Sequence, residues 1–193
     1  PGKIMHETRK GEMAVMREYV GPLAQQALEI FSKKYEFTPK GPILIEMFPK
    51  HDDFAVRTVG LPGMIGALGA CFGRVVTLDS PKARPPGDFN WAPTLWHELG
   101  HVMTLQLSKQ RVPRWLTEGI SVYEEKLGSP AWGREGELTF AMAYGQGEHM
   151  SLRELNAAFQ DPEKISLAYY EASILAEHIV DTYGMAALRK LLV

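Results

Sequence analysis

Residues 94–101 read T-L-W-H-E-L-G-H and set two imidazoles and a carboxylate into an otherwise apolar, helix-forming run. The side chains around them suit the buried face of a helix: Leu95, Trp96, Leu99, Val102, Met103 and Leu105. An unpaired polar group on such a face costs a few kcal/mol. Some interaction must therefore offset the cost of burying these polar groups, and binding of a cation is one candidate.

The spacing of these polar residues favours a metal site. Positions four apart in a helix lie on one face, so His97 and His101 can direct ring nitrogens at a common ion. Zinc accepts such nitrogens at about 2.0–2.1 Å, and a catalytic zinc site needs a third protein ligand and an open position for water. Zinc lowers the pKa of its water to about 7, and Glu98 is placed to act as the general base for it. The H-E-x-x-H spacing thus predicts attack of an activated water on a carbonyl.

The third ligand must come from elsewhere in the chain. The extended H-E-x-x-H-x-x-G-x-x-H pattern is excluded, because Thr104 and Leu107 stand where it requires glycine and histidine. Residues 115–119, W-L-T-E-G, open the next predicted helix. Glu118 in this segment can complete a set of two histidines and one carboxylate, which is a ligand set of zinc peptidases.

The other histidines have no partner at ligand spacing, so we expect each to be a surface or hydrogen-bonded side chain: His6, His51, His149 and His178. A charge of −2 lacks the basic excess that favours nucleic acid or anionic membranes, so neither is an expected partner. The single cysteine, Cys71, excludes an internal disulfide without assigning a compartment.

The length of 193 residues fits one domain, which would bury roughly 70% of its unfolded surface. No apolar run of membrane-spanning length appears, and the first ten residues are too polar for a signal peptide. We therefore expect a soluble domain over residues 1–193. Because the chain starts at Pro1 without an initiator methionine, we expect it to be part of a longer or processed protein.

The first half of the chain mixes helical and strand patterns. Residues 12–35 have the period of an amphipathic helix, which Gly21 and Pro22 should kink or divide into two abutting helices. Three short apolar runs predict strands, at 43–48, 54–59 and 74–79. The glycines of 60–73 predict turns and bulges, because neither phosphate-binding glycine pattern is present.

The second half reads as helices, at 90–107, 115–127, 135–144, 151–159 and 166–183, with an amphipathic tail over 185–192. Asn90 can cap the first of these helices, and Ser151 with Glu154 forms a capping-box pattern at the fourth. The predicted fold class is α+β: an N-terminal helix, a small mixed sheet and a mainly helical C-terminal part.

Three segments together resemble the gluzincin group of zinc peptidases, and specifically its compact peptidase MA-like domains, which are distantly similar to aminopeptidase N. The segments are F-N-W-x-x-x-L-W-H-E-x-x-H, V-P-R-W-x-x-E-G-x-S and A-Y-Y-x-A-S, at residues 89–101, 112–121 and 168–173. The likeness covers about the last two-thirds of the chain. It implies a thermolysin-like catalytic fold. Such domains are often attached to tetratricopeptide repeats, so a repeat region in the parent chain is an expected partner.

The resemblance implies roles for particular residues. His97, His101 and Glu118 would bind one Zn²⁺, and Glu98 would be the general base. A tyrosine of a Y-x-x-[GS] element would stabilise the oxyanion at the attacked carbonyl, and Tyr170 fits this element as Y-E-A-S. The adjacent Tyr169 would face about 100° away on a helix, so only one of the two can point at the zinc. The alternative is that both are core aromatics.

The resemblance also implies that a strand edge beside the active helix holds the substrate backbone. The stretch 66–73 can supply this edge, although a plain structural strand explains it equally well. The chain lacks the glycine-containing exopeptidase signature and an acidic anchor for a free amino terminus, which favours an endopeptidase. Glu124 or Glu125 can orient a ligand histidine, but exposed helix charges are the simpler interpretation.

The sequence thus predicts zinc-dependent hydrolysis of peptide bonds in a peptide or protein substrate. Two alternatives remain. A peptidase-like fold can serve as a silent binding or scaffold module of a repeat-containing protein, but such a module would not need Glu98. The same activated water can also hydrolyse a non-peptide amide or ester.

Overall fold

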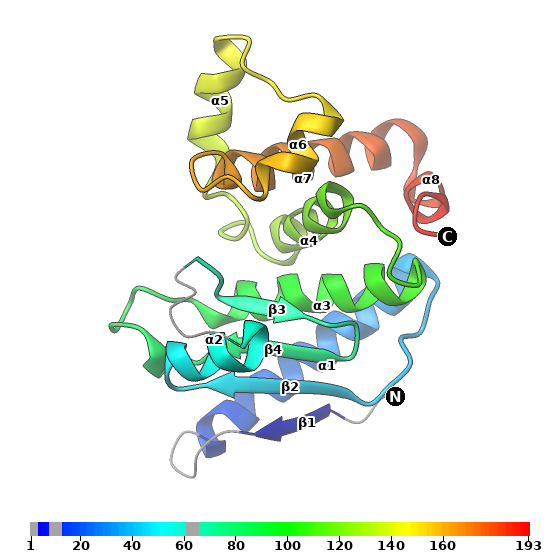
Figure 1. Cartoon of the computed structure of the whole chain (residues 1–193). Helices are drawn as coiled ribbons and strands as arrows, with labels where there is room; N and C mark the ends of the chain where they lie inside the picture. The colour runs from blue at the N-terminus through cyan, green and yellow to red at the C-terminus, as the bar shows by residue number, and fades with distance from the viewer. Residues whose placement is uncertain (1–3, 8–12, 61–65) are drawn as a thin grey trace. The chain divides into compact units, whose positions relative to one another are not determined.

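The computed structural model of the chain describes residues 4–7, 13–60 and 66–193, with side chains for 16–60 and 66–193. Its backbone forms two compact units, Pro1–Gln106 and Leu107–Val193. The first unit contains a small sheet with helices, and the described elements of the second are all helices (Figure 1). The fold is α+β, as predicted, with an N-terminal helix, a mixed sheet and a mainly helical C-terminal part.

The first unit contains both strands and helices. Its elements are β1 (Ile4–Glu7), α1 (Met13–Tyr35), β2 (Ile43–Phe48), α2 (His51–Val59), β3 (Gly69–Cys71), β4 (Val75–Asp79), the 3₁₀ helix η1 (Pro81–Ala83) and α3 (Trp91–Leu107).

The sheet has four strands in the order β1-β2-β4-β3. The first three are parallel, with Leu44 of β2 opposite Val75 of β4. β3 runs antiparallel to β4, with Cys71 opposite Val76. Parallel neighbours need a crossover connection, and α1 supplies it between β1 and β2. β3 is consequently an edge strand of this sheet.

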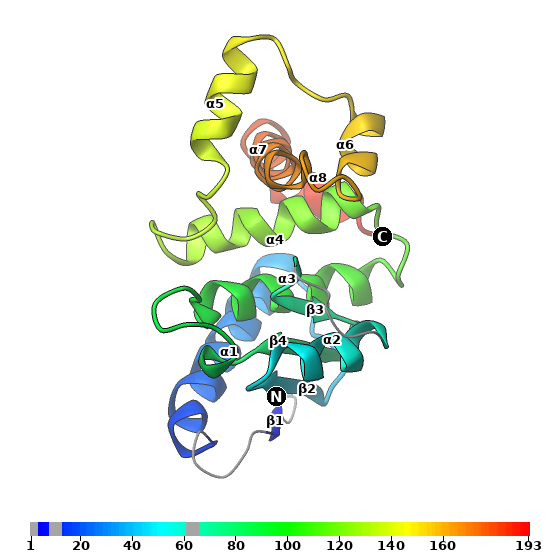
Figure 2. The same cartoon turned by 60° about the vertical axis from the view of Figure 1, so that its left-hand side comes forward.

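The two faces of the sheet carry different helices. On one face Phe48 contacts Phe54 of α2, with ring centroids 6.4 Å apart, and Glu46 pairs with Arg57 of the same helix at 2.8 Å. Figures 1 and 2 show α1 and α3 on the opposite face. Side chains alternate between faces along a strand, and those of this opposite face are buried: Ile43, Ile45, Met47, Val76 and Leu78.

α1 is one helix that continues through Pro22. The predicted helix is confirmed, but its division into two abutting helices is wrong. Proline removes one backbone hydrogen bond, and buried apolar side chains on both sides of it hold the helix against the core. They recur every three or four residues: Met16, Val20, Ala24, Ala27, Phe31 and Tyr35.

The predicted strand at 54–59 is wrong, because these residues belong to α2. Burial does not alternate here: the neighbours Phe54 and Ala55 are both buried, while Val56 is exposed. Asp52 and Asp53 lie in the first turn, where negative charge favours a helix. Gly60 ends the helix in the left-handed conformation (φ 77°) and donates its N–H to the Val56 carbonyl.

The strands predicted at 43–48 and 74–79 are confirmed as β2 and β4. β1 was not predicted, because its four residues are too few to show an apolar pattern. They form a strand because they pair with β2. Of the glycine-rich stretch 60–73, residues 61–65 lie outside the described residues, and 69–71 form β3.

The second unit contains α4 (Arg114–Gly128), α5 (Glu137–Gly145), α6 (Leu152–Ala158), α7 (Ile165–Tyr183) and α8 (Met185–Lys190). The four helices predicted after residue 107 and the amphipathic tail are confirmed, with shifts of one or two residues at their ends. The predicted capping box is also present: the Ser151 hydroxyl accepts from the Glu154 N–H, and the Glu154 carboxylate accepts from the Ser151 N–H. No helix among the described residues combines the length and apolarity that crossing a membrane requires.

α4 packs along α7 at very short range, because Gly119 faces the α7 backbone. A β-carbon at Gly119 would lie 2.4 Å from the carbonyl oxygen of Ala172. The glycine directly after Glu118 therefore lets the two helices approach, and its role here is packing.

Candidate metal centre

α3 carries the H-E-x-x-H residues on a helix that is buried over most of its length. Asn90 caps it as predicted, because its side-chain oxygen accepts from the Ala92 N–H at 3.2 Å. Pro93 lies in the first turn, where the missing N–H costs nothing. The capped, buried helix gives the polar residues of the motif a rigid support.

His97 and His101 bring their rings together as the spacing predicts. Their Nε2 atoms lie 3.1 Å apart, and the two rings are nearly perpendicular at 76°. Two nitrogens that bind one tetrahedral zinc at about 2.0–2.1 Å would be separated by roughly 3.3 Å. The observed separation therefore fits a shared cation.

The third candidate ligand, Glu118, lies in the first half of α4 and is buried. Its Oε1 is 3.4 Å from Nε of Arg114, one turn earlier in the same helix. The ligand atoms of His97, His101 and Glu118 lie within 4.8 Å of one another, so this group can hold a metal ion. Two imidazoles and one carboxylate form a donor set that suits zinc.

Glu98 lies between the two histidines in the sequence and is only 5% exposed. The edge strand β3 lies beside it. Burial, and then the negative charge of Glu98, raises the pKa of the Cys71 thiol. A β-carbon at Gly69 would lie 2.7 Å from Glu98 Oε1. The carboxylate is therefore enclosed by the strand that the sequence suggested as a substrate edge.

Tyr170 and Tyr169 occupy different environments on α7. The ring of Tyr170 packs against Phe140 at 5.4 Å, and the ammonium of Lys126 lies 5.3 Å from its centroid. Burial, and then the charge of Glu137, raises the pKa of Tyr170. Its phenol therefore keeps its proton at neutral pH and can donate a hydrogen bond. Tyr169 instead meets Phe159 edge to face at 5.2 Å, in the cluster beside α6.

The helices α4 and α7 bury further carboxylates, of which the sequence interpretation missed Glu171. Glu124 is 2% exposed and Glu125 is also buried, so the expectation that they are exposed helix charges is wrong. Glu125 follows Glu118 by seven residues, a spacing that returns to the same helix face and was a usable signal. Glu171 accepts the Met150 N–H on Oε1 at 2.8 Å, and burial raises its pKa.

Two of the remaining histidines, His51 and His178, lie within hydrogen-bond distance of a neighbouring side chain. His51 Nδ1 lies 2.9 Å from Asp79 Oδ2, and Arg84 contacts the same oxygen at 3.1 Å. His178 Nδ1 lies 3.3 Å from the Thr182 hydroxyl. These two fit the expectation of hydrogen-bonded side chains. The side chain of His6 lies outside the described ones.

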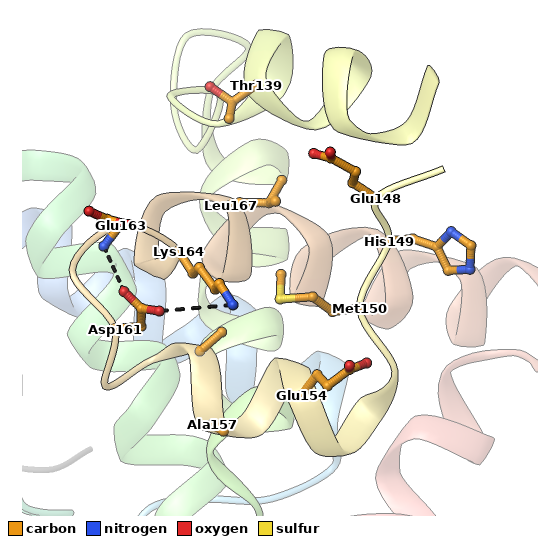
Figure 3. A pocket seen from close by; sticks show the side chains of 11 residues that line it. Thr139, Glu148, His149, Met150, Glu154, Ala157, Asp161, Glu163, Lys164 and Leu167 are labelled. Carbon is orange, nitrogen blue, oxygen red and sulfur yellow. Dashed lines mark hydrogen bonds and ion pairs between the residues drawn. The ribbon is translucent and has the colours of Figure 1, made fainter. Parts of the chain in front are cut away.

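The second unit also contains a cavity of about 640 Å³ beside α5, α6 and α7 (Figure 3). Figure 3 shows Met150, Leu167 and Lys164 directed toward its centre. The Nζ atom of Lys164 lies 4.0 Å from Oδ2 of Asp161. The lining contains four carboxylates: Glu148, Glu154, Asp161 and Glu163. None of the predicted site residues lines this cavity.

The chain matches the model of a known protein family. Residues 83–193, more than half of the chain, match the family model of the Peptidase MA superfamily. The matched range includes all five predicted site residues. Neither the comparison with curated proteins nor that with solved structures gives a match.

Proposed function

Because the chain belongs to the peptidase MA superfamily, we propose that it is a zinc-dependent hydrolase of peptide bonds. Membership in the superfamily indicates a peptidase-like enzyme. The zinc dependence, the gluzincin type and the endopeptidase activity are our proposal. The observation that carries it is the grouping of His97, His101 and Glu118, whose ligand atoms lie within 4.8 Å of one another.

His97, His101 and Glu118 would hold the ion through two imidazole nitrogens and one carboxylate oxygen. When bound, zinc would supply a Lewis acid that polarises the scissile carbonyl and acidifies water. Glu98 would take a proton from the attacking water and return it to the nitrogen of the leaving amine. Its burial supports this role, because a carboxylate shielded from bulk solvent is held in one place.

Tyr170 would donate a hydrogen bond to the oxyanion that forms at the attacked carbonyl. Its raised pKa supports the proposal, because a donor must keep its proton. Tyr169 is less suited to this role, because its ring is packed edge to face on Phe159.

The substrate we propose is a peptide or protein bound in extended form along β3. An edge strand has backbone groups that are available for pairing, and small residues such as Gly69 and Ala70 leave room for a second backbone. This geometry favours an internal peptide bond. We further propose that residues 1–193 act as one catalytic domain of a longer, repeat-containing protein.

The decisive experiment combines metal analysis with cleavage. The purified protein should contain one zinc per chain by elemental mass spectrometry and should cleave members of an internally quenched peptide library. Glu98→Gln should retain zinc and lose at least about 100-fold in kcat. A protein that binds zinc but cleaves no peptide would favour the scaffold alternative, and full cleavage by Glu98→Gln would refute the mechanism.

A further inference from the structure

The strand β3 turns one face toward the helix that carries Glu98. Its pairing with β4 places Gly69 opposite Leu78 and Cys71 opposite Val76. Leu78 and Val76 point into the core, so by alternation the positions of Gly69 and Cys71 face the same side. Glu98 contributes to the raised pKa of Cys71, which agrees with this orientation.

Gly69 lies against the side chain of Glu98 so closely that no side chain fits at this position. A β-carbon there would lie 2.7 Å from Oε1 and 2.9 Å from Cγ of Glu98, and 2.9 Å from Cγ2 of Thr94. Distances under 3.0 Å essentially never occur for real β-carbons. Thr94 precedes Glu98 by one helical turn, so Gly69 covers a ridge of α3 that both residues form.

The glycine at this position is required for space and not for backbone conformation. Its φ lies outside the left-handed range in which glycine is favoured, unlike that of Gly60 or Gly73. An alanine could therefore adopt the same backbone, and only the contacts with Glu98 and Thr94 oppose it.

We propose that Gly69 is a positioning residue, which fixes the carboxylate of Glu98 by direct contact of the β3 backbone with its side chain. This inference rests on the proposed function, in which Glu98 is the general base. Glu98 is almost fully buried, so its side chain has little room to move away from an added methyl group. The contact with Cγ matters most, because moving that atom requires rotation near the backbone rather than at the carboxylate end.

The test compares Gly69→Ala with Gly145→Ala. Gly145 is the last residue of α5 and has no role in the proposed site, and a β-carbon there would meet nothing within 4 Å. Both variants lose the same backbone freedom in the unfolded chain, so their difference reports the folded contact. We expect Gly69→Ala to lower kcat about 100-fold, with KM within about threefold of wild type and zinc content unchanged. Gly145→Ala should match the wild type.

A thermal unfolding cycle supplies a readout that does not depend on activity. Gly69→Ala should lower the Tm of the wild type by about 3–10 °C. In a Glu98→Ala background the same change should cost less, because Oε1 and Cγ of Glu98 are gone and only the contact with Cγ2 of Thr94 remains.

The outcomes separate the inference from the proposed function. If the wild type cleaves peptides and Gly69→Ala keeps full kcat, the inference is wrong. Equal losses of Tm in both backgrounds would also refute it, because Glu98 would then not be the residue that Gly69 contacts. If the wild type neither binds zinc nor cleaves peptides, the proposed function fails, and the cycle alone decides whether Gly69 holds Glu98.

Discussion

The Nε2 atoms of His97 and His101 lie 3.1 Å apart on successive turns of α3. Two nitrogens at this distance can share a proton or a metal ion. Glu118 provides a carboxylate oxygen within 4.8 Å, which favours the metal.

Zinc binding should therefore stabilise the folded protein. Free zinc at 100 times its Kd would add about 2.7 kcal/mol, which corresponds to a rise in Tm of about 5–10 °C for a chain of this size. Differential scanning calorimetry with and without a chelator measures this shift. His101→Ala should abolish it and His178→Ala should keep it, because His178 lies outside the ligand group. An unchanged shift in His101→Ala would contradict the assignment.

Tyr170→Phe should lower kcat by about 10²–10³-fold while zinc content stays at the wild-type level. The change removes only the phenol O–H and leaves the ring on Phe140. Tyr169→Phe is the matched control on the neighbouring residue and should retain activity. Steady-state kinetics on one quenched peptide distinguish the two, and a loss confined to Tyr169→Phe would exchange their roles.

Gly119→Ala should be strongly destabilising, because the added β-carbon meets a backbone carbonyl of Ala172 that cannot rotate away. We expect a loss of about 3 kcal/mol in the free energy of unfolding, measured by urea denaturation. Gly145→Ala provides the control, since a β-carbon there meets nothing within 4 Å. Equal stability of the two variants would show that α4 and α7 can separate without cost.

Glu171 should make stability depend on pH with an unusual sign. Burial raises its pKa above the ordinary 4.5, so the folded state binds more protons than the unfolded state above that pH. The stability contribution of Glu171 is therefore present below pH 4.5 and is lost as pH rises through the folded pKa.

Glu171→Gln cannot ionise, and its side-chain oxygen can still accept the Met150 N–H. The stability of Glu171→Gln relative to wild type should therefore increase as pH rises from 4 to about 7, because only the wild type loses the contribution of Glu171. Urea titrations at several pH values measure this difference. A difference that stays constant with pH would show that Glu171 titrates normally.

The helix with the candidate ligands was predictable because its determinants are local. Asn90 provides a cap, and the apolar period continues for seventeen residues to Leu107. The four-residue spacing of His97 and His101 then fixes their common face. The same applies to α6, whose capping box at Ser151 lies within one turn of sequence.

The failures concern features that depend on tertiary contacts. The run 54–59 is too short for periodicity to separate helix from strand, and its residue Phe54 is buried against Phe48 of β2. β1 exists because β2 pairs with it. Glu171 is buried and accepts the N–H of Met150, which lies 21 residues earlier in the chain, so the pattern along one helix predicts solvent exposure for it.

The only thiol of the chain lies on the strand that encloses Glu98. Because its pKa is raised, Cys71 stays protonated at neutral pH and reacts slowly with alkylating reagents. Alkylation of Cys71 should therefore become faster when β3 separates from α3, because the separation removes the burial that raises its pKa. Mass spectrometry of the alkylated protein would time this local opening without any introduced probe.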